Sequence, residues 1–224
     1  MTSRLRMLFE PVALCLCMVI GVAIIWTAQW FNEYPAYKHW HWFNLFGLAD
    51  KRWSIGRREL VHLAGFIGCI LSSWALIESF KFKSLRVIQG CLAVMALLWA
   101  TAHWLEPAFI AYSVHHFWGH KMSVAQATYG FTIMCLMCLE KWGGTRISAL
   151  VALQSVTAFA VFISLGWELF CQPVLGLNRT LETTGLDAAQ ILCDMISISL
   201  GFALTYGVLK MLESEQLPTA IRAQ

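Results

Sequence analysis

The sequence predicts an all-α polytopic transmembrane bundle of about six helices, with both termini on the cytoplasmic side. Of its 224 residues, 58% are hydrophobic and only 13% are charged, whereas soluble domains carry about 25% charged residues. A soluble fold of this length cannot bury so much apolar surface behind so few charges. The net charge of +3 is also too small for a surface that binds nucleic-acid phosphates. The composition therefore excludes a soluble enzyme, a disordered chain and a nucleic-acid-binding domain.

Six segments are apolar enough to span a bilayer core of about 30 Å, which takes about 20 residues of helix. They form a single transmembrane domain over residues 1–224, with spans at approximately 9–30, 60–80, 87–105, 124–139, 147–171 and 188–211. The fourth is short at its apolar core. Pro107 would break a straight continuation of the third span, because proline breaks a helix. Residues 107–117 are apolar enough either to lie in the interface or to dip into the membrane. The first span is too long for a signal peptide and has a poor cleavage site, so we expect a retained helix.

The lysines and arginines set the orientation of these spans. Cytoplasmic loops carry an excess of both residue types, and short loops follow the rule best. With the N-terminus inside, nine of the sixteen fall on the cytoplasmic side, and five of the other seven lie in one long loop, residues 31–59. The two short loops with Lys81, Lys83 and Arg86 and with Lys141 and Arg146 favour the same orientation. We expect a multi-pass protein of a bacterial inner membrane.

The long first loop is rich in aromatic residues, which favour the headgroup level of a bilayer. Its segment 37–43, Tyr-Lys-His-Trp-His-Trp-Phe, is typical of a stretch that lies flat on the membrane. It predicts either a simple interfacial anchor or a lid over a site that faces lipid.

The eight cysteines all lie in or beside the apolar segments, where a thiol usually packs as a small hydrophobic group. Cys135 and Cys138 have the C-x-x-C spacing of redox pairs, but they lie near the C-terminal end of a helix, whose dipole opposes a thiolate. Core packing is the stronger interpretation, and a quinone-linked thiol oxidoreductase is the alternative. Cys171 and Cys193 flank the last outer loop and could form one disulfide.

Two carboxylates, Glu168 and Asp194, lie inside predicted spans, where ionisable groups are costly and usually functional. We predict them as catalytic residues. Other polar residues collect in the same outer half of the predicted topology, and from these we select a substrate-binding set: Arg179, Gln172, Asp187, Arg57 and Arg58. His62, at the start of the second span, belongs to the same half, as do His103 and Glu106. The set predicts a polar site open to the outer leaflet or, alternatively, structural ion pairs between helices.

The histidines raise the question of a metal. His116 and His120 are four residues apart, so on a helix they could face one ion together with His115. Seven histidines in all are too few for a membrane di-iron hydroxylase. A b-type haem needs two axial histidines on facing helices, for which His62 and His103 are the available pair.

The C-terminal third reads Gly166-Trp-Glu168-Leu-Phe-Cys-Gln172, then Asn178-Arg179-Thr180, with Asp187, Asp194 and Gly201 in the last helix. Over about 45 residues this resembles the VanZ-like proteins and the related YjdF-type membrane proteins. The sequence departs from the first pattern in having Asn178 in place of glycine, and from the second in having Cys193 before the aspartate. The resemblance implies a role in the cell envelope and assigns no reaction.

Three functions remain open at this point. The first is an inner-membrane protein that binds or acts on an envelope lipid or lipid-linked molecule, with Glu168 and Asp194 as key groups and Arg179 as their charge partner. The second is a non-catalytic subunit or assembly factor of a membrane complex, in which Gly65 and Gly68 would let a partner helix approach. The third is a metal- or haem-binding redox protein. The sequence decides neither the cofactor nor whether the chain is an enzyme.

Overall fold

The computed structural model describes residues 3–33, 41–44, 54–105, 129–135, 137–138, 147–171 and 188–220. Within these residues, five helices are long and apolar enough to cross a membrane, at Phe9–Ala28, Glu59–Ser79, Lys83–Thr101, Ala149–Phe170 and Ala188–Ser214. These helices confirm the predicted polytopic α-helical bundle. The protein is a multi-pass membrane protein.

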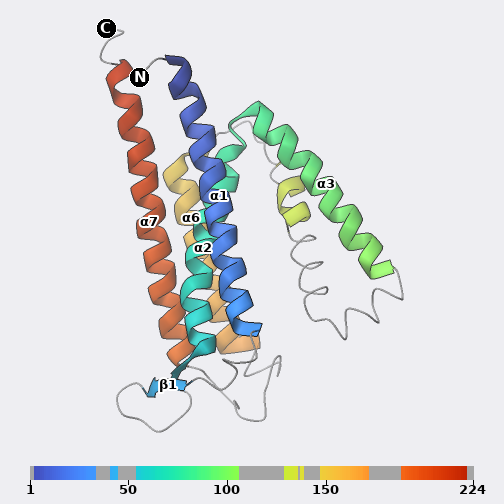
Figure 1. Cartoon of the computed structure of the whole chain (residues 1–224), viewed down its shortest axis with the longest axis vertical. Helices are drawn as coiled ribbons and strands as arrows, with labels where there is room; N and C mark the ends of the chain where they lie inside the picture. Colours follow the sequence, from blue (N-terminus) through green and yellow to red (C-terminus); the bar gives the residue numbers. More distant parts are fainter. Residues whose placement is uncertain are drawn as a thin grey trace. The chain divides into compact units, whose positions relative to one another are not determined.

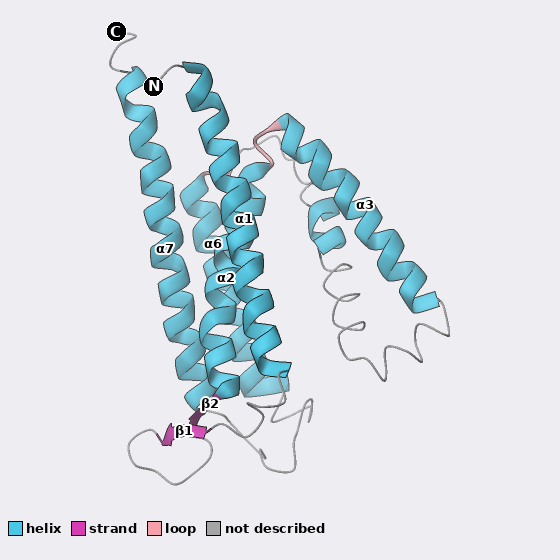
Figure 2. Ribbon diagram, viewed as in Figure 1, coloured by secondary structure: helices cyan, strands magenta, loops and turns pink. Residues whose placement is uncertain are grey.

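The elements follow the chain in a simple order (Figures 1 and 2). They are α1 (Ser3–Glu33), β1 (His41–Asn44), β2 (Ser54–Gly56), α2 (Arg57–Ser79), α3 (Lys83–Leu105), α6 (Ala149–Gly166), the π-helical turn η4 (Trp167–Cys171) and α7 (Ala188–Ala220). The sequence predicted no strand, so the short β1–β2 pair is a finding of the structure. The residues group into two compact units, one of Met1–Glu78 with Ser148–Gln224 and the other of Ser79–Ile147.

The first unit contains α1, α2, α6 and α7, which alternate in direction (Figure 1). Ser3 and Ala220 lie at the same end, in agreement with the prediction that both termini are on one side. The last turns of α2 lie against the start of α6, where the indole Nε1–H of Trp74 donates to the carbonyl of Ala149 at 3.1 Å.

This arrangement bears on the number of spans. Because α2 ends and α6 begins at the same end of the unit, the chain between them crosses the membrane an even number of times, and α3 supplies one crossing. An even number would need one more crossing besides α3, and the sequence analysis predicts it at 124–139. Its described residues, 129–135 and 137–138, are helical.

Glycines set the closest helix contacts in the first unit. A Cβ on Gly21 of α1 would stand 2.7 Å from the carbonyl oxygen of Gly68 in α2, so the two backbones touch. A Cβ on Gly201 of α7 would stand 3.1 Å from the Cα of Ile67 in α2. Close backbone approach at small residues is the usual packing of membrane helices. Gly68 thus receives α1 of the same chain, whereas the sequence analysis assigned it, with Gly65, to a helix of a partner subunit.

A buried stripe of small and polar residues runs along α7. Its members repeat every three or four residues, which keeps them on one face of the helix: Gln190, Asp194, Ser197, Gly201 and Thr205. Ser197 accepts a hydrogen bond from the backbone N–H of Ile67 at 3.1 Å, so this face packs on α2.

Thr205 provides a stability test of this stripe. Its hydroxyl is fully buried, and its Oγ1 has no hydrogen-bond partner. We expect Thr205→Val, which keeps the shape and removes the hydroxyl, to raise the free energy of unfolding by about 1 kcal/mol, because a buried unpaired polar group costs about 1–3 kcal/mol. Thr157→Val is the control, since the Thr157 hydroxyl donates to the carbonyl of Leu153 at 2.8 Å. Unfolding by SDS titration in mixed micelles measures both, and a loss of stability in Thr205→Val would contradict the expectation.

In the second unit, α3 packs against the helical residues 129–135 and 137–138. The hydroxyl of Tyr129 donates to the Oε1 of Gln89, and a Cβ on Gly130 would stand 3.1 Å from the carbonyl oxygen of Ala93.

One expectation about the cysteines is wrong. Cys135 and Cys138 are exposed on their helix, so they do not pack in a core. Helix rotation decides this outcome, and a spacing of three residues does not reveal which face a helix buries. The disulfide between Cys171 and Cys193 stays a prediction, because the side chain of Cys171 lies outside what the structure describes.

Candidate functional site

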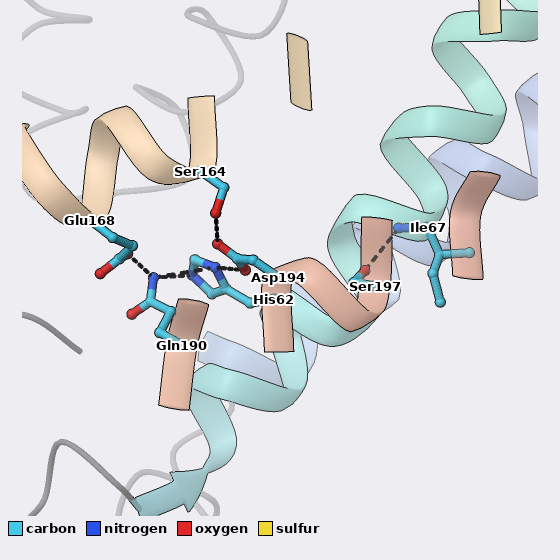
Figure 3. Close-up of polar contacts among 7 residues, drawn as sticks. All are labelled: His62, Ile67, Ser164, Glu168, Gln190, Asp194 and Ser197. Carbon is cyan, nitrogen blue, oxygen red and sulfur yellow. Dashed lines mark hydrogen bonds and ion pairs between the residues drawn. The ribbon is translucent and has the colours of Figure 1, made fainter. Parts of the chain in front are cut away.

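A cluster of polar side chains occupies the end of the first unit where α6 ends and α2 and α7 begin (Figure 3). Four elements contribute to it: His62 comes from α2, Ser164 from α6, Glu168 from η4, and Gln190 and Asp194 from α7. The members are 22 to 132 residues apart along the chain wherever they bond to one another. The fold alone brings them together.

The start of α2 is held by a local hydrogen bond and by the small sheet. The backbone N–H of Gly56, the residue before α2, donates to the Oε2 of buried Glu59 at 2.7 Å. In a capping box the side chain of the third helical residue accepts from the N–H before the helix in the same way. Strand β2 pairs antiparallel with β1 and contacts α7. These contacts fix the first turn of α2 beside α7, and with it the position of His62.

The end of α6 widens into the π-helical turn η4, a feature that occurs frequently at functional sites. Both Ser164, in the last turn of α6, and Glu168, at the start of η4, are buried. The widened turn keeps these two side chains, four residues apart, directed at α7 (Figure 3).

Asp194 is the centre of the hydrogen bonding. Its Oδ1 accepts from the Nδ1 of His62 at 2.8 Å, and its Oδ2 accepts from the hydroxyl of Ser164 at 2.5 Å. Because an ionised carboxylate only accepts, the proton of the His62–Asp194 bond belongs to Nδ1. In the neutral tautomer with its proton on Nδ1, the ring has its lone pair on Nε2.

Gln190 links His62 to the second carboxylate. Its amide nitrogen donates to the Oε1 of Glu168 and lies 3.0 Å from Nε2 and 3.2 Å from Nδ1 of His62. One carbon, Cε1, separates the two ring nitrogens, so an atom this close to both would collide with that carbon if it lay in the ring plane. The amide nitrogen therefore lies over the face of the ring, a weak N–H contact with an aromatic system.

Burial distinguishes His62 from the other members. Asp194 and Glu168 are each 1% exposed, and Gln190 and Ser164 are equally buried. The side chain of His62 is 27% exposed. His62 is therefore the member of the cluster that a ligand from outside can reach.

The depth of the cluster follows from residues with a known preference for the membrane surface. Near the other end of α7, the Lys210 ammonium lies 5.4 Å from the centre of the Tyr206 ring, and both residues are exposed. Lysine and tyrosine favour the membrane surface. Lys210 is 16 residues from Asp194, about 24 Å along a helix that rises 1.5 Å per residue. Because the hydrocarbon core is about 30 Å thick, Asp194 lies only several ångströms inside the opposite boundary.

The structure brings Glu168 and Asp194 into one cluster, and it places the backbones of Arg57 and Arg58 at the start of α2. The side chains of both arginines lie outside what the structure describes, as do the whole residues Gln172, Arg179 and Asp187 and the three histidines His115, His116 and His120. Within the described part of the chain, no group of three His, Cys, Asp or Glu side chains could hold a metal ion.

The sequence analysis missed Gln190 and Ser164, and it did not pair His62 with Asp194. Gln190 could have been predicted from the sequence, because it lies four residues before Asp194 and shares its helix face. Ser164 stands four residues before Glu168 in the same way. An uncharged polar residue in an apolar span gives a weaker signal than a carboxylate.

No family model, curated protein or solved structure matches the chain. The class of the protein is therefore defined from its own fold and site. The fold and the site define a polytopic α-helical membrane protein with a buried histidine–carboxylate cluster near one face of the membrane.

Proposed function

We propose that this protein binds, and acts on, the polar part of an envelope lipid or lipid-linked molecule at the outer-leaflet face of a bacterial inner membrane. The assignment of the cluster to the outer face rests on the distribution of lysine and arginine in the loops. Glu168 and Asp194 are key groups of the site, and His62 is its point of contact with the ligand.

One observation carries the proposal: the buried network of Asp194, Glu168, Gln190 and Ser164 leads to a single partly exposed side chain, that of His62. Charged groups inside a membrane are costly and usually functional. A network that only held helices together would gain nothing from an exposed imidazole at its edge.

The depth of the cluster supports a lipid as the ligand. Asp194 lies several ångströms inside the hydrocarbon boundary, close to the headgroups, by the helix length from Lys210. A lipid in the surrounding bilayer presents its polar atoms near this level without leaving the membrane. A water-soluble ligand would have to enter the apolar region instead.

The proposal predicts that the purified protein retains a lipid and that the amide variants lose it. Native mass spectrometry of gently purified protein, with metal analysis on the same sample, is the measurement. We expect a bound lipid or lipid-linked sugar in the wild type, and at least about tenfold lower occupancy in Asp194→Asn and Glu168→Gln, since about 1.4 kcal/mol of lost interaction gives that factor. Glu213→Gln is the control, because Glu213 is exposed and pairs with Lys210 at the other end of α7.

Each other outcome contradicts the proposal in its own way. Equal occupancy in all four proteins would show that the lipid binds elsewhere. A bare protein that carries only a partner subunit would leave the role of an assembly factor. A stoichiometric metal would make the histidines at 115, 116 and 120 the site to pursue.

A further inference from the structure

From the geometry of the cluster we infer that His62 is a proton-transferring residue, which accepts a proton at Nε2 from a hydroxyl group of the membrane lipid or lipid-linked ligand. Asp194 is its positioning residue. The inference deepens the proposed function, on which it rests for its ligand. It assigns that site a chemistry as well as an affinity.

The first support is the fixed orientation of the imidazole. Nδ1–H donates to Asp194 at 2.8 Å, and the other carboxylate oxygen is held by Ser164 at 2.5 Å. Both oxygens of Asp194 are thus in use, so neither the carboxylate nor the ring can turn freely. A histidine whose Nδ1–H is held by a carboxylate presents its Nε2 lone pair outward, which is the arrangement of a general base.

The second support is that the in-plane lone pair of Nε2 is open. The neighbouring amide of Gln190 lies over the face of the ring, as its nearly equal distances of 3.0 and 3.2 Å to the two nitrogens require. Among the described residues, the hydrogen bonds and ring contacts of His62 involve only Asp194, Gln190 and the tilted ring of Phe66, whose centroid is 6.5 Å away. None of these lies in the ring plane at Nε2.

The third support is space beside the ring on α2. Gly65 and Cys69 follow His62 by three and seven residues and so share its helix face. A Cβ added to Gly65 would meet no atom within 4 Å, and Cys69 is exposed. A ligand can therefore approach His62 along this face.

The inferred step is a proton transfer alone. The O–H bond of the ligand hydroxyl breaks, its proton bonds to the Nε2 lone pair, and its electron pair stays on the oxygen, which becomes an alkoxide. The ring becomes an imidazolium with a proton on each nitrogen. The Asp194 carboxylate balances the new positive charge through the bond to Nδ1–H, which stays in place. Return of the same proton from Nε2 to oxygen restores the neutral ring, so no further reactant is needed.

The test uses diethyl pyrocarbonate, which acylates an accessible imidazole nitrogen, on the full-length protein in lipid nanodiscs. Mass spectrometry of the His62 peptide gives the rate of modification. We expect His62 to react in the wild type and about tenfold or more slowly in Asp194→Asn, because a neutral amide holds the Nδ1–H, and with it the outward direction of Nε2, more weakly than a carboxylate does. In Ser164→Ala, which keeps the carboxylate, we expect a change below about threefold.

The SDS-unfolding midpoint of each variant is the control for folding. A slower reaction at an unchanged midpoint reflects a change at the ring of His62 and not a loss of the fold. An unreactive His62 in the wild type, or equal rates in the wild type and Asp194→Asn, would overturn the inference. Lipid occupancy, measured on the same samples, separates the two proposals. Retained lipid with an unreactive His62 leaves binding alone, and a reactive His62 without lipid removes the proposed ligand.

Discussion

Replacing Asp194 with alanine is expected to lower the free energy of unfolding by about 2–3 kcal/mol, because two donors lose their acceptor and an unpaired buried polar group costs about 1–3 kcal/mol. The carboxylate is 1% exposed and accepts two hydrogen bonds, from His62 and from Ser164. Without it, the Nδ1–H of His62 and the hydroxyl of Ser164 lose their partner in a region with no water to replace it. Equilibrium unfolding in mixed micelles of SDS measures the loss.

Asp194→Asn is the matched control for this prediction. The amide has the same shape, its oxygen can accept from His62, and its NH₂ can donate to the oxygen of Ser164. We therefore expect a loss of about 1 kcal/mol or less, near the mean value for a hydrogen bond between membrane helices. Equal losses in the two variants would mean that the bonds of Asp194 do not stabilise the bundle.

A double-mutant cycle with His62→Ala then isolates the pair. Once Asp194 is gone, removing His62 also removes an unpaired donor, so the double variant should be less destabilised than the sum of the single variants. Strict additivity would show that the 2.8 Å contact contributes no energy.

The two carboxylates could be found from the sequence because a charge in an apolar span is conspicuous. Glu168 and Asp194 stand out in this way, and the loop charges assigned them to one side of the membrane. Their partners could not be found in the same way. Whether His62 faces the cluster depends on the rotation of α2, which is set by helix–helix contacts and not by composition.

Those contacts are made at glycines. Gly201 lets α7 approach the backbone of α2 at Ile67, and Ser197 on the same face accepts a hydrogen bond from the N–H of that residue. One helical turn further on are Asp194 and His62. The helix register that buries Gly201 is therefore the one that brings the carboxylate to the imidazole. The spans could be predicted from hydropathy, but this register depends on contacts between segments more than 100 residues apart.

The β1–β2 pair escaped prediction for a different reason. The aromatic residues of the first loop indicated an interfacial segment, because tryptophan and tyrosine favour that level. The same residue types also favour strands. His41–Asn44 forms a strand because it pairs with Ser54–Gly56, a segment that contacts α7 in the fold.

The contact between α1 and α2 leads to the second large effect. We expect Gly68→Val to lower the free energy of unfolding by about 3 kcal/mol or more, at or above the upper end of the usual cost of overpacking. A Cβ at Gly68 would stand 2.5 Å from the carbonyl oxygen of Gly21 and 2.8 Å from Cγ1 of Ile25. The first of these is a backbone atom of a continuous helix, so it has no rotamer by which to move away. The SDS-unfolding midpoint measures the change.

Gly65→Val is the matched control, three residues earlier on the same helix and with the same substitution. No atom lies within 4 Å of a Cβ at Gly65, so only the small difference in helix propensity remains, and we expect a change within about 0.5 kcal/mol. Equal effects at the two positions would show that α1 and α2 do not pack at Gly68. In Gly68→Val the helices must separate, and because α2 also carries His62, the pair with Asp194 should loosen. A slower reaction of His62 with diethyl pyrocarbonate in the fraction that still folds would link this packing contact to the site.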